Sequence, residues 1–548
     1  MLLPPIEDYE AFVRDYERED LDTYNYVDLI DRYAEDEERL ALLWTNAEGD
    51  ECRLTFKDIS QASARLAHAL QERGVKKGDR ILLMFPRSPE WAIAALAGLR
   101  IGAVTCSCVT MLQPADLEYR IDKAKPKAVI TTAEESGKFE GISDGVDVKI
   151  AVGGADGFED WSEALDGKHA AFENVPLKWD DPASLYFTSG STGHPKGVVH
   201  GAHFAHYLKE VSAYWLDLNH QSKDDLFWCT ADTGWALAAT GWLVGPWLAG
   251  IAVFVHDGPF DPLKRAQLMQ QYAVTVFCAP ATELRWIINI PLEEFDLSNL
   301  RLTVSTGEML DAPTAARWAQ GTGARLNEAF GQTESFMTIA NMAGQEIRAG
   351  SMGKAVPGFD IEVLDQDSYA VAKPGVVGHI AIKTPTRALL LEYLDDPEKT
   401  AEVYKEGPEG RWYVTGDLAR RDEDGYFFYE GRADDLINSS GYRIGPSEVE
   451  AALMDHPAVL DCAAVGAPDP QRGEVVKAFV ILKDDWKARG DGALIPELQN
   501  HVKVETAPYK YPRAIEFVDE LPRTATGKVR RKTLRDQEYE KFGERHSA

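Results

Sequence analysis

The chain has 548 residues, of which 45% are hydrophobic and 27% are charged, and its formal net charge is −31 at pH 7. This length exceeds what one hydrophobic core usually supports, so we expect two or more domains. The acidic excess argues against nucleic acid and against an anionic membrane surface as partners. No apolar run is long enough to span a bilayer.

The N-terminus and the cysteines indicate a location. The first residues, MLLPPIEDYEAF, lack the basic flank of a secretory signal and are too acidic for a mitochondrial transit peptide. The six cysteines are scattered, and Cys106 and Cys108 are too closely spaced for a C-x-x-C pair. The sequence therefore predicts reduced thiols, no zinc framework, a cytoplasmic location and no stable membrane association.

The apolar pattern predicts alternating helices and strands over about 300 residues. The expected helices are 55–74, 89–99, 262–271 and 280–288, and the expected strands are 81–85, 127–132, 275–279 and 302–305. Such alternation is typical of an α/β fold in which helices cover largely parallel sheets. We therefore expect a large N-terminal domain of this kind over residues 1–433.

The pattern changes after about residue 434. The expected helices are then 447–454 and 494–504, and the expected strands are 459–465, 475–482 and 514–518. We interpret residues 434–548 as a small, mobile α+β C-terminal domain. This part is close to neutral, and residues 523–535 contain six basic residues and no acidic one. That local charge fits either a site for a polyanionic small molecule or a solvated basic helix end.

A glycine- and hydroxyl-rich stretch, YFTSGSTGHPKG, occupies residues 186–197 between two expected strands, 183–187 and 197–200. Its glycines permit unusual backbone angles, and its hydroxyls and Lys196 suit a polyphosphate. It is not a standard P-loop, because Gly197 follows the lysine, and it does not match a G-x-S-x-G nucleophile elbow. Composition alone leaves a flexible hairpin tip as the alternative.

Four further stretches follow in order: EAFGQTE (328–334), YVTGDLARR (413–421), GRADDLINSSGYRIGPSEVE (431–450) and PRTATGKVRR (522–531). With the Gly-rich stretch, their order and spacing resemble the adenylate-forming superfamily of acyl-CoA synthetases, adenylation domains and luciferases. The resemblance covers nearly the whole chain. ADTGW (231–235) and TAPYKYPRAIEF (506–517) look closest to medium-chain acyl-CoA synthetases.

The resemblance implies an ATP site. Glu334 and Thr188 would bind Mg²⁺, Thr333 would donate to the α-phosphate, and Asp417 and Arg432 would hold the ribose. The residues implied to bind ATP are Thr188, Ser189, Gly190, Ser191, Thr192, Gly193, His194, Pro195, Lys196, Gly307, Glu308, Glu328, Ala329, Phe330, Gly331, Gln332, Thr333, Asp417, Arg432, Arg443 and Lys528. Gly307 and Glu308 would lie at the adenine.

The resemblance also implies that the small domain rotates between two half-reactions about a hinge at Asp434. In one orientation Lys528 would act in catalysis with Thr333 and Glu334. In the other, the SSGYR loop would replace it and receive CoA as co-substrate. The residues implied to bind CoA are Ser440, Gly441, Tyr442, Arg472 and Lys503.

The function that the resemblance implies is that of an AMP-forming acyl-CoA synthetase, an acid–thiol ligase of fatty acid metabolism. Gly331 stands where acetyl-specific relatives have Trp, so we expect Gly331, Trp235 and Thr333 to form an open acyl pocket for a medium-chain, branched or aromatic acid. Two alternatives stay open: a stand-alone adenylation enzyme that loads a carrier protein, and a non-catalytic ATP- or acyl-binding protein. The sequence makes no prediction of the oligomeric state.

Three histidines recur at every third residue, namely His200, His203 and His206. On a helix they would share one face, as metal ligands do, but no carboxylate completes a zincin-like pattern. We favour the interpretation that they line the site below the Gly-rich loop.

Overall fold

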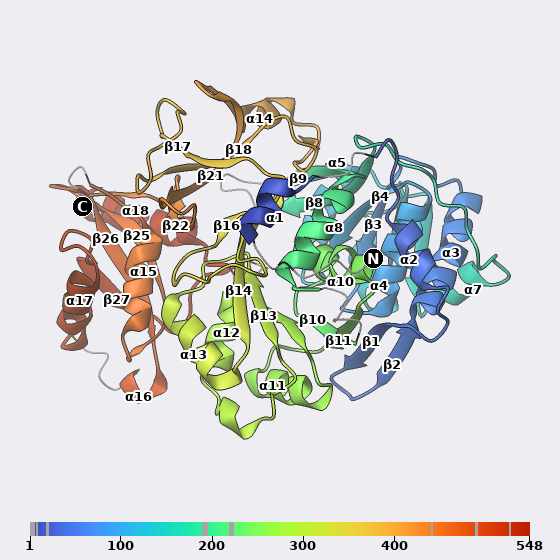
Figure 1. Cartoon of the computed structure of the whole chain (residues 1–548), viewed down its shortest axis with the longest axis horizontal. Helices are drawn as coiled ribbons and strands as arrows, with labels where there is room; N and C mark the ends of the chain where they lie inside the picture. The colour runs from blue at the N-terminus through green and yellow to red at the C-terminus, as the bar shows by residue number, and fades with distance from the viewer. Residues whose placement is uncertain are drawn as a thin grey trace.

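The computed structural model describes the chain except for residues 1–5, 7–8, 18–20, 189–194, 219–223, 440–441, 488–491, 525–527 and 548. Its described part is a mixed α/β protein with four sheets. Figure 1 shows two helix-covered sheets at the right and lower centre, a third sheet above them, and the C-terminal residues as a separate unit at the left. The predicted fold class is confirmed.

The first sheet carries the strands on either side of the Gly-rich stretch. In spatial order its strands are β19 (Glu392–Tyr393), β9 (Lys196–Gly201), β8 (Pro182–Thr188), β4 (Val104–Cys108), β3 (Arg80–Met84), β5 (Ala128–Thr132), β6 (Val148–Val152) and β7 (Glu159–Asp160). The strands from β8 to β7 pair in parallel, whereas β9 runs antiparallel to both neighbours. Strands β8 and β9, which flank the Gly-rich stretch, therefore lie next to the parallel strands near one end of this sheet.

The second sheet carries the EAFGQTE stretch. In spatial order its strands are β16 (Lys354–Ala355), β15 (Phe336–Ala340), β14 (Arg325–Gln332), β13 (Leu302–Thr306), β12 (Val276–Cys278), β10 (Leu226–Cys229), β11 (Ala252–Asp257), β1 (Leu40–Asn46) and β2 (Glu51–Thr55). The strands from β14 to β1 pair in parallel, and antiparallel strands close both ends. The motif thus lies where the last parallel strand turns back along β15.

The helices of this N-terminal part follow the expected alternation. They are α1 (Tyr9–Asp15), α2 (Val27–Tyr33), α3 (Phe56–Glu72), α4 (Pro89–Arg100), α5 (Pro114–Ala124), α6 (Ala133–Ser136), α7 (Trp161–Leu165), α8 (Phe204–Trp215), α9 (Ala236–Ala238), α10 (Pro246–Ala249), α11 (Pro262–Gln271), α12 (Ala281–Ile287), α13 (Ala312–Thr322) and α14 (Pro397–Glu402). Two 3₁₀ turns, η1 (Gly137–Phe139) and η3 (Leu292–Glu294), and a π-helix, η2 (Ala239–Val244), accompany them.

Side-chain caps explain where several of these helices begin. Thr55 and Asp58 form a reciprocal capping box at the start of α3, with Thr55 Oγ1 accepting from the Asp58 N–H at 3.1 Å. Asp311 accepts from the Thr314 N–H at 2.9 Å and so starts α13. The expected helices 55–74, 89–99 and 262–271 lie within one or two residues of α3, α4 and α11.

A third sheet was not predicted. Its strands are β17 (Ile361–Leu364), β18 (Gly378–Lys383), β21 (Gly410–Arg421), β20 (Tyr404–Gly407) and β22 (Phe427–Arg432), and all of their pairings are antiparallel. Strand β21 carries the TGD motif, so Asp417 lies within a strand and directly opposite Arg432 of β22. The alternation seen earlier in the chain gave no indication of this antiparallel unit.

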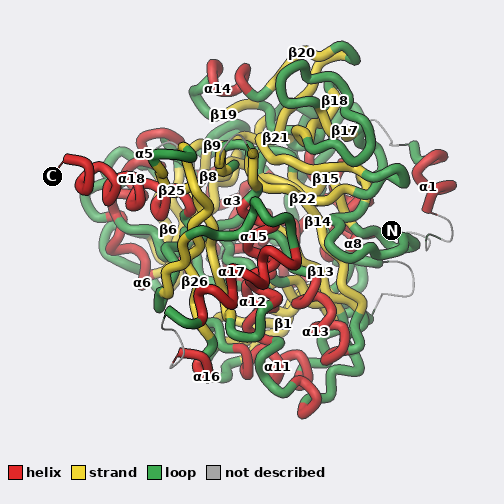
Figure 2. The backbone as a smooth tube through the Cα atoms, turned by 90° about the vertical axis from the view of Figure 1, so that its left-hand side faces the viewer, coloured by secondary structure: helices red, strands yellow, loops and turns green. Residues whose placement is uncertain are grey.

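The C-terminal part has its own sheet and core. Its strands are β23 (Ile437–Ser439), β24 (Tyr442–Ile444), β25 (Val459–Asp469), β26 (Gly473–Leu482) and β27 (Ala514–Phe517), and its helices are α15 (Pro446–Asp455), α16 (Asp484–Lys487), α17 (Leu494–Glu505) and α18 (Arg531–Ser547). A buried cluster that includes Ile437, Leu453 and Val480 fills this unit. Figure 2, viewed from this side, shows α15 and α17 in front of the strands. The boundary at residue 434 stays a prediction.

Among the described helices, none is both long enough and apolar enough to cross a membrane. All six cysteines are free thiols, and five of them are buried.

Candidate functional site

The ends of the Gly-rich loop meet at one pair of residues. Thr188 of β8 pairs with Lys196 of β9, and the Pro195 carbonyl accepts a hydrogen bond from the Tyr119 hydroxyl at 3.0 Å. Burial and the nearby charge of Lys399 lower the pKa of Lys196, whereas the charge of Glu334 raises it. Ser189, Gly190, Ser191, Thr192, Gly193 and His194 lie outside the described residues. The predicted phosphate loop thus begins and ends beside a partly desolvated ammonium group.

Glu334 lies next to this lysine. Its Oε1 accepts a hydrogen bond from the Tyr393 hydroxyl at 2.8 Å, and the ammonium of Lys196 is 5.5 Å from the centroid of the Tyr393 ring. Burial and Glu334 together raise the pKa of Tyr393, so the phenol stays protonated and donates. The structure therefore brings together the lysine of one motif and the carboxylate of another through a tyrosine of β19.

Asp417 is a buried carboxylate held by three strands. Its Oδ1 accepts from the Tyr429 hydroxyl at 3.0 Å, and its other oxygen accepts from the Gln332 amide. Burial raises the pKa of Asp417, whereas the charges of Arg432 and Lys528 lower it. The carboxylate thus joins β14, β21 and β22, and it lies within electrostatic reach of the lysine from the C-terminal unit.

Arg432 contacts both Asp417 and the residue predicted to be the hinge. Its Nη1 lies 3.6 Å from Asp417 Oδ2, and its Nε donates to Asp434 Oδ1 at 3.2 Å. On the other side, the guanidinium of Arg535 donates to the Asp434 carbonyl at 3.1 Å. The predicted hinge residue, Asp434, is therefore held by two arginines, one from each unit.

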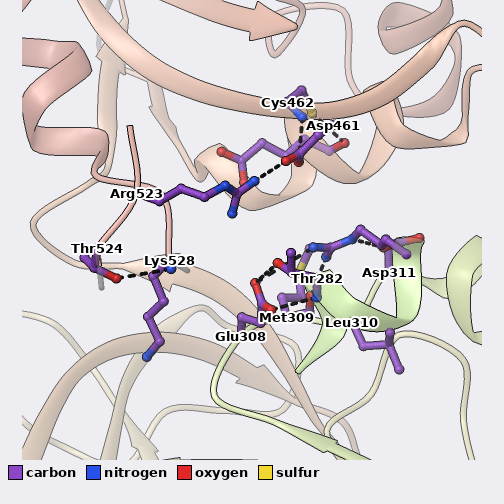
Figure 3. Close-up of polar contacts among 12 residues, drawn as sticks. Thr282, Glu308, Met309, Leu310, Asp311, Asp461, Cys462, Arg523, Thr524 and Lys528 are labelled. Carbon is purple, nitrogen blue, oxygen red and sulfur yellow. Dashed lines mark hydrogen bonds and ion pairs between the residues drawn. The ribbon is translucent and has the colours of Figure 1, made fainter. Parts of the chain in front are cut away.

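The STGEML stretch forms a polar wall opposite the C-terminal unit (Figure 3). Gly307 has a φ of +91°, a conformation that favours glycine. Glu308 accepts from the backbone N–H of Thr282 at 2.7 Å and from its hydroxyl at 2.8 Å. Burial disfavours a charge on Arg285, but Glu308 and Asp311 raise its pKa. Arg285 also donates to the Met309 carbonyl at 2.8 Å, so the stretch has a fixed conformation.

Lys528 faces this wall from the C-terminal unit in Figure 3. Its backbone N–H donates to Thr524 Oγ1 at 3.2 Å, and its carbonyl accepts from the Thr524 N–H at 2.7 Å. Nearby, Arg523 forms an ion pair with Asp461 of β25. Burial raises the pKa of Asp461, and Arg523 and Arg285 lower it. The side chains of the two units therefore interact across this boundary.

The residues predicted for CoA are only partly placed. Ser440 and Gly441 lie outside the described residues, and Tyr442 and Arg443 belong to the short strand β24. Ser439, at the end of β23, pairs with Gly473, so Arg472 lies near that strand end. Lys503 lies on α17, with its ammonium 4.0 Å from the centroid of the Tyr511 ring. The CoA roles of all five residues stay predictions.

A side chain at Gly331 would find no open space in this structure, and the expected place of Gly331 in an acyl pocket stays a prediction. A Cβ atom at this position would lie 1.7 Å from the carbonyl oxygen of Phe336 and 2.4 Å from its carbonyl carbon. The cause is a bulge in the pairing of β14 and β15 at residues 330 and 331. Glycine is needed here because a neighbouring backbone occupies the space. Trp235 precedes α9, and its buried indole N–H has no hydrogen-bond partner among the described residues.

The histidines do not form a metal site in the described part of the chain, where no group of three potential ligands occurs. His200 is buried on β9, and its Nε2 donates to the Thr333 carbonyl at 2.7 Å. Burial lowers the pKa of His200 to about 4, so the ring is neutral near pH 7. His203 and His206 lie at the start of α8. His200 thus holds the backbone of the FGQTE motif at Thr333.

Several contacts of the site were missed by the motif analysis. Tyr393 holds Glu334, Tyr429 holds Asp417, and Arg285 holds Glu308 at 3.9 Å. Tyr393 and Arg285 lie far in sequence from the motif residues they contact, so no local signal indicates them. Tyr429 lies three residues before Arg432 on the same strand, where regular alternation would place them on opposite faces; an irregularity in the pairing of β21 and β22 breaks that alternation, so no local signal indicated this contact either.

This chain matches a known protein family and is similar to known proteins over nearly its whole length. A family described as "AMP-binding enzyme" matches residues 30–394, and its C-terminal domain matches residues 448–528. The chain is 37% identical to acyl-coenzyme A synthetase ACSM3, mitochondrial, from Pongo abelii, over 97% of this chain and 92% of that protein. It is 40% identical to the uncharacterized acyl–CoA ligase YtcI of Bacillus subtilis, over 94% of this chain and 96% of that protein.

The fold of this chain is also similar to solved structures of CoA ligases and acyl-CoA synthetases. The anthranilate CoA ligase AuaEII, determined in complex with anthranoyl-AMP, superposes with a TM-score of 0.85 at 29% identity, and covers 96% of this chain and 98% of its own.

The contact at Gly331 predicts the effect of a minimal substitution. Gly331→Ala should destabilise the protein by about 1–3 kcal/mol, because the added methyl group must displace the backbone of Phe336. The measurement is thermal or denaturant unfolding. Gly145→Ala, at an exposed site with no atom within 4 Å of the added Cβ, is the matched control. Equal stability of the two variants would refute the close approach.

Glu328 predicts a pH dependence of stability. Burial raises the pKa of Glu328 to about 8, although the Leu310 N–H donates to it at 3.4 Å. Unfolding lets this carboxyl ionise at its ordinary, lower pKa, so its contribution to stability is lost as pH rises from about 4.5 through 8. Glu328→Gln should therefore raise the unfolding temperature at pH 8.5, with a smaller gain at pH 5.5. A gain that grows toward acid pH would contradict the raised pKa.

Proposed function

The chain belongs to the AMP-binding enzyme family and is an acid–thiol ligase of the acyl-CoA synthetase type, and we propose that its substrate is a medium-chain, branched or aromatic carboxylic acid. ATP would activate the acid and CoA would accept it, with release of pyrophosphate and then AMP. The observation that carries the proposal is that the buried carboxylate of Asp417, from TGD, accepts hydrogen bonds from Gln332 of FGQTE and Tyr429 and pairs with Arg432. Motif residues from distant parts of the chain meet there.

The first half-reaction requires a nucleophile, an electrophile and charge stabilisation. The substrate carboxylate would attack the α-phosphorus of ATP, and the bond to the leaving pyrophosphate would break. Lys196 and Lys528 would offset the negative charge on the phosphates, and Asp417 would accept from the ribose hydroxyls. Asp417 would then exchange partners, because Tyr429 and Gln332 donate to its oxygens here.

The donor set near the loop suits a hard cation. Glu334 has one oxygen that accepts from Tyr393 and a second one with no hydrogen-bond donor among the described residues, and Thr188 supplies a hydroxyl at the strand end. Such oxygen donors fit Mg²⁺. When bound, the ion would neutralise charge on the transferring phosphates. Tyr393 orients the Glu334 carboxylate for that role.

The second half-reaction would move the acyl group from AMP to sulfur. The CoA thiol would attack the acyl carbon, and the bond to the AMP oxygen would break. We propose that a rotation about Asp434 replaces Lys528 with the loop at residues 439–443. Arg432 would have to release Asp434 for this rotation, because its Nε donates to that carboxylate.

A panel of acids from acetate to dodecanoate, with benzoate, tests the proposal. AMP release should require acid, ATP and CoA together, and mass spectrometry should detect the acyl-CoA thioester. Acid-dependent pyrophosphate release with no response to CoA would favour the alternative, an adenylation enzyme that loads a carrier protein. Absence of acid-dependent pyrophosphate release would favour a non-catalytic binding protein.

We further propose a cytoplasmic location with no nucleic acid partner, supported by the free thiols and the net charge.

Replacing the catalytic lysine should separate the half-reactions. Lys528→Ala should slow pyrophosphate release by roughly 10²–10³-fold, because a preorganised positive charge is lost. Thioester formation from a supplied acyl-adenylate and CoA should be retained. Lys532→Ala, an exposed lysine of the same basic segment, is the control. Parallel loss of both steps in Lys528→Ala would refute a role limited to adenylation.

A rigid residue at the hinge should have the complementary effect. Proline fixes φ near −65°, so Asp434→Pro should form acyl-adenylate but slow its transfer to CoA about tenfold or more. Asp434→Ala keeps backbone freedom while it removes the contact with Arg432, and it serves as the control. Rapid-quench measurement of the two steps reports the difference. Normal transfer in the proline variant would move the hinge elsewhere, with Asp435 as the nearest candidate.

A further inference from the structure

An internal cavity of about 40 Å³ lies beneath the strands that carry the Gly-rich loop. Residues from α4, β4, β8, α8 and η2 line it, including Trp91, Ser107, Tyr186, Phe204, Ala205 and Leu243. None of the described lining residues carries a charged side chain. A water molecule needs about 10–15 Å³ by the same measure, so the space admits a few atoms and no additional ring.

Phe336 stands beside this cavity in an unusual conformation. Its φ is +50°, which a bulky residue rarely adopts, and its side chain is buried. The centroid of its ring is 3.9 Å from that of Phe204 and 6.0 Å from that of Tyr186, and both of these residues line the cavity. Such backbone strain persists where the surroundings hold the residue, and it is concentrated at functional sites.

The backbone of Phe336 lies beside the FGQTE strand. Phe336 pairs with Gln332, and its carbonyl occupies the space beside Gly331. Its ring centroid is 5.0 Å from that of His200, which donates to the Thr333 carbonyl. The ring therefore packs on one side against His200, which contacts the FGQTE strand, and on the other against two residues that line the cavity.

We propose that the ring of Phe336 is the wall that ends the acyl pocket, and that it limits the length of the straight-chain acid. This proposal rests on the proposed function. An acyl chain that extends inward from Thr333 meets this ring before it reaches the cavity. Because the space beyond has no charged lining residue, it admits an apolar tail and disfavours the second carboxylate of a dicarboxylic acid. The substrate class is thus a monocarboxylic acid with an apolar tail.

Removal of the ring should join the cavity to the pocket. Phe336→Gly removes the side chain and relieves the positive φ, and this relief offsets part of the packing that is lost with the buried ring. The ratio of kcat/KM for decanoate to that for butanoate should rise about tenfold or more, because each buried methylene contributes to discrimination. Phe336→Leu, which keeps an apolar side chain, should give a smaller rise. Hexanedioate should stay a poor substrate of both variants.

A double variant provides the matched control. Ala205 lines the cavity from α8, so Phe336→Gly/Ala205→Leu refills part of the space without restoring the wall. The decanoate preference should fall back toward that of the parent chain. Unfolding temperatures of all variants establish that they are folded. An unchanged ratio in a folded Phe336→Gly protein would overturn the proposal.

A binding measurement separates this inference from the proposed function. Calorimetry with the non-hydrolysable decanoyl and butanoyl sulfamoyl adenosines reports pocket size without turnover. The ratio of the two Kd values should shift toward the decanoyl compound in Phe336→Gly. Binding of both compounds with an unchanged ratio would overturn only the role of Phe336. Binding of neither to the parent chain would refute the proposed function and this proposal with it.

Discussion

The buried carboxylate of Asp417 is the contact on which the arrangement of the site depends. A carboxylate in this position needs partners, because burial raises its pKa and disfavours its charge. Gln332, Tyr429 and Arg432 supply them from two other segments of the chain. The antiparallel unit that carries the TGD motif is therefore fixed against the strand that carries FGQTE. The two motifs belong to separate sheets, and this contact holds them together.

The same contact links the nucleotide region to the C-terminal unit. Arg432 interacts with Asp417 and with Asp434, and the charge of Lys528 acts on Asp417. A ligand whose hydroxyl groups donated to Asp417 would compete with Arg432 for that carboxylate. Because Arg432 also holds the residue before the C-terminal sheet, occupancy of the site and the orientation of that unit are physically coupled. This coupling is what a two-step ligase requires.

Local patterns predicted the helices and strands well, and motif resemblance indicated the family. Periodicity and caps located α3 and α11 within one or two residues. The antiparallel sheet from β17 to β22 was missed, because most of its strands follow one another without a helix between them, so the helix–strand alternation is absent there. Long-range effects were also missed. The space beside Gly331 is filled by Phe336, and Tyr393 reaches Glu334 from 59 residues away. Such contacts depend on the packed fold and have no local signature.

The most direct test of the account is acid-dependent exchange of labelled pyrophosphate into ATP in the absence of CoA. The account predicts that exchange requires a carboxylic acid, because a bound acyl-adenylate must form reversibly before CoA reacts. Addition of CoA should then discharge that intermediate and yield one AMP for each thioester. Exchange that proceeds without any acid, or thioester formation that never passes through an exchangeable intermediate, would contradict it.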